Sequence, residues 1–342
     1  MYTFVRSLFF KLEPEIAHHL TLQLMQIGGM QPINAILHAM YSAPSKPVEV
    51  FGLTFKNPVG LAAGYDKDGI AVRGLSALGF GHIEVGTVTP LPQPGNPKPR
   101  VFRLMEDEAV VNRMGFPSHG EEKVMHSLQS IYKAKTRRPN IILGVNLGKN
   151  KNTPNEEAVL DYLELLDNFA SLANYLAINV SSPNTVGLRQ LQGRDALHGL
   201  LTQLNHQRTL EETRLEKRIP LLVKLAPDLT DEELDDALGV ILDTGMDGVI
   251  ATNTTVARST LRSKHRGETG GLSGSPLRVQ SEAMLEKIVK RVNGQVPIVS
   301  VGGIMNPEDA KRRLDMGAAL VQVYTGLIYR GPGLVREIIN SL

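Results

Sequence analysis

The chain has 342 residues, 42% of them hydrophobic and 21% charged, which is the balance of a globular protein large enough to bury its own core. The formal net charge is only +2, so the overall charge gives no reason to expect nucleic acid as a partner. Because the sequence contains no cysteine, disulfides, thiolate metal sites and a cysteine nucleophile are excluded. No apolar run approaches the roughly 20 residues that a membrane-spanning helix requires.

The first 45 residues are predicted to form a helical hairpin, which extends a main domain over residues 46–342. Apolar side chains recur at helical spacing before residue 13 and again after Pro14, which suits the first turn of a second helix. Gly28-Gly29 suits the end of that helix, and a polar linker with prolines follows. Two interpretations stay open: the hairpin packs on the main domain, or its aromatic and basic side chains lie at a membrane surface.

From residue 57 onward, short apolar runs rich in β-branched residues alternate with helical segments. The predicted strands are residues 59–63, 82–85, 141–145, 175–178, 221–225, 249–251, 298–301 and 320–323. The predicted helices are residues 70–78, 121–133, 156–172, 196–208, 231–244, 281–292, 307–316 and 334–342. Eight strands that alternate with helices predict an α/β fold, a (β/α)8 TIM barrel. An open doubly wound sheet is the alternative.

Glycine or a polar side chain stands where each of the eight predicted strands ends. Because the carboxyl ends of the strands meet at one rim of a barrel, these residues are expected to surround one active site. Gly302-Gly303 and residues 324–326 follow the last two strands, where backbone N–H groups can approach a phosphate. The glycine-rich residues 270–274 either close over the same group or form a plain turn.

Several side chains at this rim suit a small, planar, anionic ligand. Lys67 and Lys224 adjoin different strands, and a lysine there either holds a carboxylate, stabilises negative charge on a reduced ring, or is merely solvated. Residues 112–116 combine an amide, a turn and an aromatic lid. Ser182 is a poor base unless a hydrogen-bond network assists it, so spacing alone does not rank it above a structural serine. No carboxylate cluster or His-X-X-His motif indicates a metal site.

These motifs resemble the class 2, quinone-dependent dihydroorotate dehydrogenases over nearly the whole chain. The matching stretches are residues 51–53, 57–58, 62–64, 66–69, 86–90, 94–96, 99–100, 112–116, 178–179, 181–185, 224, 226–228, 251–255, 270–274 and 302–303. The resemblance implies a flavoprotein oxidoreductase that converts (S)-dihydroorotate to orotate in de novo pyrimidine (UMP) biosynthesis. It also implies FMN as hydride acceptor, and a membrane quinone, ubiquinone or menaquinone, as final electron acceptor.

The same resemblance implies roles residue by residue. Ser182 would remove the C5 proton of dihydroorotate, with Thr185 and Phe116 as supporting relay and lid. Contacts with the substrate would come from Lys67, Asn112, Arg113, Met114, Gly115, Phe116, Asn179, Asn184, Asn253 and Thr254. FMN would be held by Ala63, Gly64, Tyr65, Asp66, Lys67, Thr87, Asn146, Asn179, Lys224, Thr252, Gly274, Gly303, Tyr324 and Thr325. The quinone path would include His18, Arg103 and Tyr324.

The missing cysteine agrees with class 2, because class 1 relatives use a cysteine base. The hairpin would then be the anchor and quinone entrance of an enzyme bound peripherally to lipid, at the cytoplasmic face of the bacterial inner membrane. Pro117, Val186 and Tyr65 depart from the usual Asn, Pro and Leu or Phe of the family. Two other functions stay open: an FMN barrel enzyme for another pyrimidine or a 2-hydroxy acid, and a flavoprotein without catalytic activity.

Overall fold

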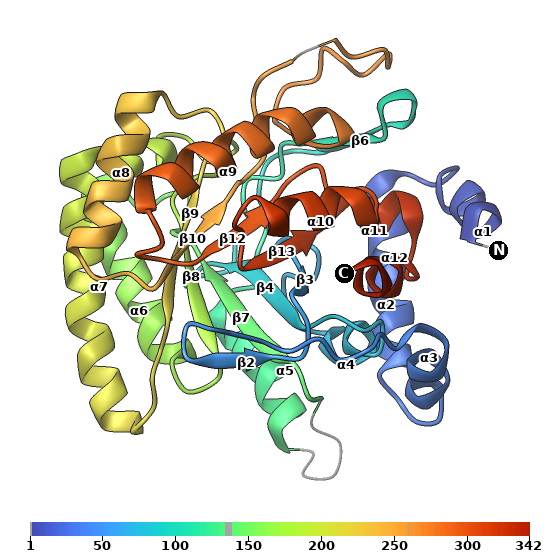
Figure 1. Ribbon diagram of the computed structural model, residues 1–342, viewed down its shortest axis with the longest axis horizontal. Helices are drawn as coiled ribbons and strands as arrows, with labels where there is room; N and C mark the ends of the chain where they lie inside the picture. The colour runs from blue at the N-terminus through green and yellow to red at the C-terminus, as the bar shows by residue number, and fades with distance from the viewer. Residues whose placement is uncertain (1, 134–138, 259) are drawn as a thin grey trace.

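The computed structural model describes residues 2–133, 139–258 and 260–342, and a closed barrel of parallel strands lies at its centre (Figure 1). Around the barrel the strands follow the order β10-β12-β13-β3-β4-β7-β8-β9. Their bounds are β3 Val59–Leu61, β4 His82–Val88, β7 Ile142–Leu147, β8 Tyr175–Asn179, β9 Leu221–Leu225, β10 Gly248–Ala251, β12 Ile298–Val301 and β13 Leu320–Val323. Each overlaps a predicted strand, with bounds that differ by at most three residues, so the TIM barrel is confirmed and the doubly wound sheet is wrong.

The helices of the main domain surround the barrel (Figure 1). They are α4 Val72–Ser76, α5 Glu121–Lys133, α6 Ala158–Phe169, α7 Arg194–Leu215, α8 Asp231–Asp243, α9 Arg278–Val292, α10 Pro307–Asp315, α11 Thr325–Arg330 and α12 Leu334–Ser341. The largest buried cluster fills the layer between helices and strands. On β9, Leu221 and Val223 belong to this layer whereas Leu222 belongs to the barrel interior, as the two-residue period of a strand requires.

A short hairpin that the sequence analysis did not predict closes the amino-terminal end of the barrel. It consists of β1 Val48–Val50 and β2 Leu53–Phe55. Phe51 and Phe55 are buried among the interior side chains, including Leu222. These side chains close the amino-terminal end of the barrel interior, so a ligand-binding site can lie only at the opposite end, where the strands have their carboxyl ends.

A small antiparallel sheet joins the two longest segments between barrel strands. Its strands are β5 Val101–Leu104, β6 Ala109–Asn112 and β11 Gly271–Gly274, in the order β11-β6-β5. The register pairs Asn112 with Gly271 and Ala109 with Gly274, although these residues lie far apart in the sequence. This sheet brings the glycine-rich residues 270–274 beside the Asn-Arg-Met-Gly-Phe segment.

The N-terminal extension contains three helices, α1 Tyr2–Phe9, α2 Pro14–Gly28 and α3 Ile33–Tyr41, rather than the predicted two. Helix α2 crosses α4 so closely that a Cβ on Gly74 would lie 1.9 Å from the carbonyl oxygen of Met25. Helix α1 is held by a hydrogen bond of 2.6 Å from the Tyr2 hydroxyl to the carbonyl oxygen of Ile328 in α11. The extension therefore packs on the barrel, which is the first of the two interpretations of the sequence.

The same helices also carry large apolar side chains on their outer surface. Phe4 is 72% exposed, Ile16 54%, Leu24 51% and Ile36 56%. So many exposed apolar side chains on neighbouring helices are unusual for a surface that faces only water. Within the described residues, no helix has the length and apolar character needed to cross a membrane.

Candidate active site

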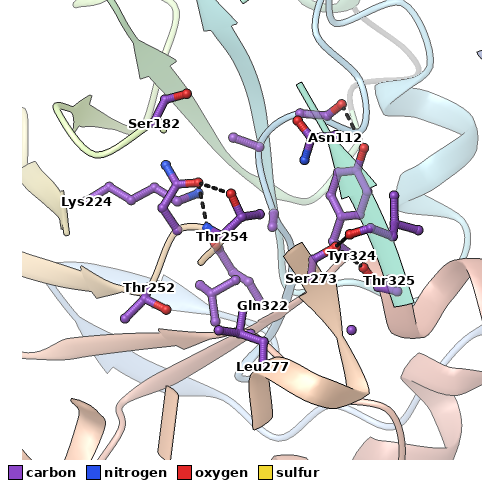
Figure 2. Close-up of a pocket in the computed structure, with 18 of the residues that line it drawn as sticks. Asn112, Ser182, Lys224, Thr252, Thr254, Ser273, Leu277, Gln322, Tyr324 and Thr325 are labelled. Atoms are coloured by element: carbon purple, nitrogen blue, oxygen red, sulfur yellow. Dashed lines mark hydrogen bonds between the residues drawn. The ribbon is translucent and has the colours of Figure 1, made fainter. Parts of the chain in front are cut away.

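One pocket lies at the carboxyl ends of the barrel strands (Figure 2). Its empty volume is about 1090 Å³, which includes open space at its mouth. Val110 of β6 and Ser273 of β11 contribute a wall above the strand ends. The sequence-predicted site residues that line it are Ala63, Gly64, Lys67, Thr87, Asn112, Met114, Gly115, Phe116, Asn179, Ser182, Asn184, Lys224, Thr252, Asn253, Thr254, Gly274, Gly303, Tyr324 and Thr325.

Four of the predicted substrate-binding asparagines form two hydrogen-bonded pairs. Nδ2 of Asn184 donates to Oδ1 of Asn112 at 3.0 Å, which joins the loop after β8 to the end of β6. Nδ2 of Asn253 donates to Oδ1 of Asn179 at 3.2 Å, which joins the ends of β10 and β8. An amide has two N–H donors and two acceptor sites. The bond between Asn184 and Asn112 uses one donor and one acceptor site, so the remaining sites can bind a flat ligand that both donates and accepts hydrogen bonds.

Ser182 lies in the loop after β8 and, in Figure 2, across the pocket from Tyr324 and Thr325. Its Oγ accepts a hydrogen bond of 3.3 Å from the backbone N–H of Asn184. The hydroxyl of Thr185 is buried and has no hydrogen-bond partner among the residues that the structure describes. Because an unpartnered buried hydroxyl costs about 1–3 kcal/mol, Thr185 is open to a bond from a ligand or water.

An ion pair that the sequence analysis missed positions the loop that carries Ser182. Nη1 of Arg189 donates to Oδ2 of Asp228 at 2.8 Å. The same guanidinium donates to the carbonyl oxygens of Ser181 and Thr254, both at 3.1 Å. Arg189 therefore holds the loop after β8 against the loop after β10. This contact fixes the position of Ser182 relative to Thr254, which is a predicted substrate contact.

A buried hydrogen-bond network lies beneath the pocket floor. Oδ1 of Asn146 accepts from the Thr87 hydroxyl at 2.6 Å and from Nδ2 of Asn179 at 3.0 Å. Nδ2 of Asn146 donates to Oε1 of Glu84 at 2.8 Å. Asn146, which was predicted to contact FMN, does not line the pocket. It contacts Thr87 and Asn179, which do. Glu84 was not among the residues predicted from the sequence, although a lone charged residue in an apolar strand is a usable signal.

Glycine is required where the last two strands meet the pocket. Gly303 has φ +72°, and a Cβ there would lie 2.4 Å from the Cα of Arg278. Beside it, the hydroxyls of Ser273 and Thr325 share a hydrogen bond of 2.8 Å (Figure 2). This part of the pocket thus combines glycine backbone with hydroxyl groups, which is the chemistry that suits a phosphate.

Aromatic rings connect the N-terminal extension with the pocket. The ring of His18 in α2 meets that of Tyr65 edge-on with centroids 5.2 Å apart, and Tyr65 meets Tyr324 in the same way at 5.7 Å. Burial lowers the pKa of His18 to about 4, so its imidazole is neutral near pH 7. Arg103 lies at the junction of α1 and α2, where Nη1 donates to the carbonyl oxygen of Phe9 at 3.0 Å.

Two further predicted residues point away from the pocket. The carboxylate of Asp66 accepts from the backbone N–H groups of Ile70 and Ala71, at 3.1 and 2.8 Å. Arg113 pairs with Glu268 at 2.6 Å. Both side chains thus organise the segments that carry pocket residues, and neither lines the pocket itself. Among residues 2–133, 139–258 and 260–342, no group of three or more His, Asp or Glu side chains is placed to hold a metal ion.

Comparison with known proteins identifies the family. The sequence matches the family model for dihydroorotate dehydrogenase over residues 46–342. The dihydroorotate dehydrogenase (quinone) of Azotobacter vinelandii is 48% identical over 343 residues, which cover 100% of this chain and 96% of that protein. The chain belongs to the dihydroorotate dehydrogenase family. The protein of the same name from Idiomarina loihiensis is 47% identical, with 100% of both chains covered.

Solved dihydroorotate dehydrogenases share the fold. The structure of DHODH from Eimeria tenella in complex with ferulenol has a TM-score of 0.87 and 42% identity, covering 96% of this chain and 90% of that one. The ligand-free form from the same organism also has a TM-score of 0.87, with 43% identity. Because these dihydroorotate dehydrogenases cover nearly the whole chain, the family relationship includes the N-terminal helices as well as the barrel.

Proposed function

We propose that this chain oxidises (S)-dihydroorotate to orotate in de novo UMP biosynthesis, with FMN as its flavin and a membrane quinone as final electron acceptor. The main support is that Ser182, Lys67 and the two asparagine pairs all belong to one pocket. Together they offer a proton acceptor, a cation for a carboxylate, and amides for a ring that carries both N–H and C=O groups.

The described residues fit a flavin in the lower part of the pocket. The hydroxyl of Thr252 and Oε1 of Gln322 are buried beside it without hydrogen-bond partners among these residues. Such atoms fit a ligand with its own donors and acceptors, as a flavin ring has. Lys224, Thr87 and Thr252 hold the ring, and Gly303, Ser273 and Thr325 hold the phosphate that distinguishes FMN from riboflavin. When bound, the flavin supplies the acceptor for the C6 hydride.

The upper part of the pocket takes the substrate. Ser182 removes the C5 proton, with Thr185 continuing the path of that proton and Phe116 covering the site against water. Lys67 holds the substrate carboxylate, and the asparagine pairs orient the ring. Arg113, Met114 and Gly115 shape the segment that carries Phe116.

Residues 1–45 form the quinone entrance, and residues 46–342 the FMN-binding barrel. The edge-on ring contacts from His18 to Tyr65 and from Tyr65 to Tyr324 support an apolar path between the extension and the flavin. Arg103 lies near its outer end. The exposed apolar side chains of α1, α2 and α3 favour peripheral binding to lipid, at the cytoplasmic face of a bacterial inner membrane. Nucleic acid is not a partner in this proposal.

Anaerobic absorbance spectroscopy tests the proposed function. Purified protein is expected to show the visible bands of FMN, and excess dihydroorotate is expected to bleach them. FMN-loaded protein that stays oxidised with dihydroorotate would contradict the substrate, and a panel of other pyrimidines and 2-hydroxy acids then identifies the true one. Protein that binds no FMN would contradict the cofactor and support a chain without this activity.

A further inference from the structure

Glu84 points into the barrel from β4 and has no exposed surface. Besides the bond from Asn146, its Oε2 accepts from the hydroxyl of Tyr175 at 3.1 Å and from Nε2 of Gln322 at 2.9 Å. Nζ of Lys224 lies 3.8 Å from Oε1. Three hydrogen-bond donors and one ammonium group, from four different strands, thus converge on Glu84. This arrangement suits a carboxylate, because a carboxylate only accepts.

Lys224 is the cation that balances this buried carboxylate. The neighbouring His82 is fully buried, and burial lowers its pKa to about 3, so it carries no charge near pH 7. Among the described residues, the ion pair of Glu84 is made with Lys224. The attraction between two buried charges of opposite sign offsets the free-energy cost of removing both from water, whereas either charge alone leaves that cost uncompensated.

Lys224 also lines the pocket, beside Thr252 and Gln322 (Figure 2). Lys224 therefore contacts both the Glu84 carboxylate and the space that the flavin takes in the proposed function. A positive charge at that place favours negative charge on the ring. The carboxylate behind it opposes that effect, because water is excluded and the local screening is weak.

We propose that Glu84 is a positioning residue that offsets the charge of Lys224 and thereby sets how readily the bound flavin is reduced. This inference rests on the proposed function. The same carboxylate orients the amide of Asn146, since Nδ2 must face Glu84 and Oδ1 must face Thr87 and Asn179. Glu84 does not line the pocket, so it acts through its partners Lys224, Gln322 and Asn146.

The test is the midpoint potential of the FMN-loaded holoenzyme, measured by spectroelectrochemical titration. Glu84→Gln keeps the shape of the side chain but removes its charge. The equilibrium constant for flavin reduction is expected to rise at least about tenfold, which for a two-electron couple is a positive shift of about 30 mV. Tyr175→Phe removes a neutral donor to the same carboxylate and is expected to shift the potential by less than half as much.

Glu211→Gln is the matched control for loss of a buried charge elsewhere, because Glu211 lies on α7, pairs with Arg214 and does not line the pocket. It is expected to leave the potential unchanged. If Glu84→Gln does not fold, Glu84→Asp keeps the charge and withdraws it from Lys224 by one methylene, with a smaller positive shift expected.

An unchanged or more negative potential in the Glu84 variants overturns the proposal, as does an equal shift in Glu211→Gln. Wild-type protein that binds no flavin overturns the proposed function and this inference together. Wild-type protein that is bleached by dihydroorotate while Glu84→Gln keeps its potential overturns only the role of Glu84.

Discussion

The carboxylate of Glu15 in α2 accepts hydrogen bonds from both Nε and Nη2 of Arg100, at 3.0 and 2.9 Å. Nη1 of the same arginine donates to the carbonyl oxygen of Asn96 at 2.9 Å. The Asn96 amide in turn donates to the carbonyl oxygen of Asn184 at 3.2 Å. One buried ion pair therefore ties the N-terminal extension to the loop that carries Ser182.

Glu15→Ala is expected to loosen α2 and to impair quinone reduction more than flavin reduction by dihydroorotate. The change leaves the buried Arg100 without its carboxylate, and breaking a buried pair in this way costs roughly 3–5 kcal/mol. Limited proteolysis of the N-terminal helices, together with separate assays of the two half-reactions, measures the effect. Glu286→Ala removes an exposed helix pair and serves as control. Unchanged proteolysis and quinone kinetics would argue against this anchor.

Ser182→Ala is expected to slow flavin reduction by dihydroorotate by roughly a hundredfold or more, because the proton acceptor is lost. The FMN content should not change, since the hydroxyl is proposed to act on the substrate. Stopped-flow absorbance measures the rate, and the visible spectrum gives the FMN content. Ser130→Ala, on the exposed side of α5, is the control. A rate for Ser182→Ala equal to that of the control removes the serine from this role.

The KM for dihydroorotate is expected to rise with pH above about 7. Burial, with a contribution from Arg100, lowers the pKa of Lys67 to about 7. Below that pH the ammonium is present to hold the substrate carboxylate, and above it the lysine must take up a proton before binding. KM should then rise by up to about tenfold per pH unit.

Lys67→Arg is the matching variant for the pH profile, because a guanidinium stays protonated throughout this range. Its KM is expected to be higher overall but flat between about pH 6 and 9. If the KM of the wild type is also flat over that range, Lys67 does not titrate in substrate binding.

Phe4→Asp is expected to weaken binding to lipid vesicles by about tenfold or more. Phe4 is 72% exposed on α1, and burying a phenylalanine side chain in an apolar phase contributes about 1.5–3 kcal/mol. Co-sedimentation with vesicles of mixed neutral and anionic lipids measures the binding. Val279→Asp is the control, because Val279 is 71% exposed but lies on α9 of the barrel. Equal loss in both variants would show that α1 is not the lipid-binding surface.

The sequence predicted the barrel because its signals are local. Each strand is a short apolar run, and on β9 the alternation of Val223 and Leu222 between two clusters follows from the chain geometry of a strand. The convergence of Asn179, Asn253 and Lys224 at one rim then follows from parallel strands alone. The third N-terminal helix and the β1–β2 hairpin were not predicted from the sequence, because their apolar runs are short.

The tertiary structure decided which of these rim residues reach the pocket and what holds them in place. Glu84 and Gln322 are separated by 238 positions, and Glu15 and Arg100 by 85, so no local pattern predicts their pairing. The need to satisfy buried charges acts only after the chain has brought them together and removed water. By itself the sequence determined a barrel with a polar rim. Burial determined that His18 is neutral and that Lys224 is balanced by a carboxylate beneath the pocket floor. The ion pair with Glu268, a residue distant in the sequence, determined that Arg113 points away from the pocket.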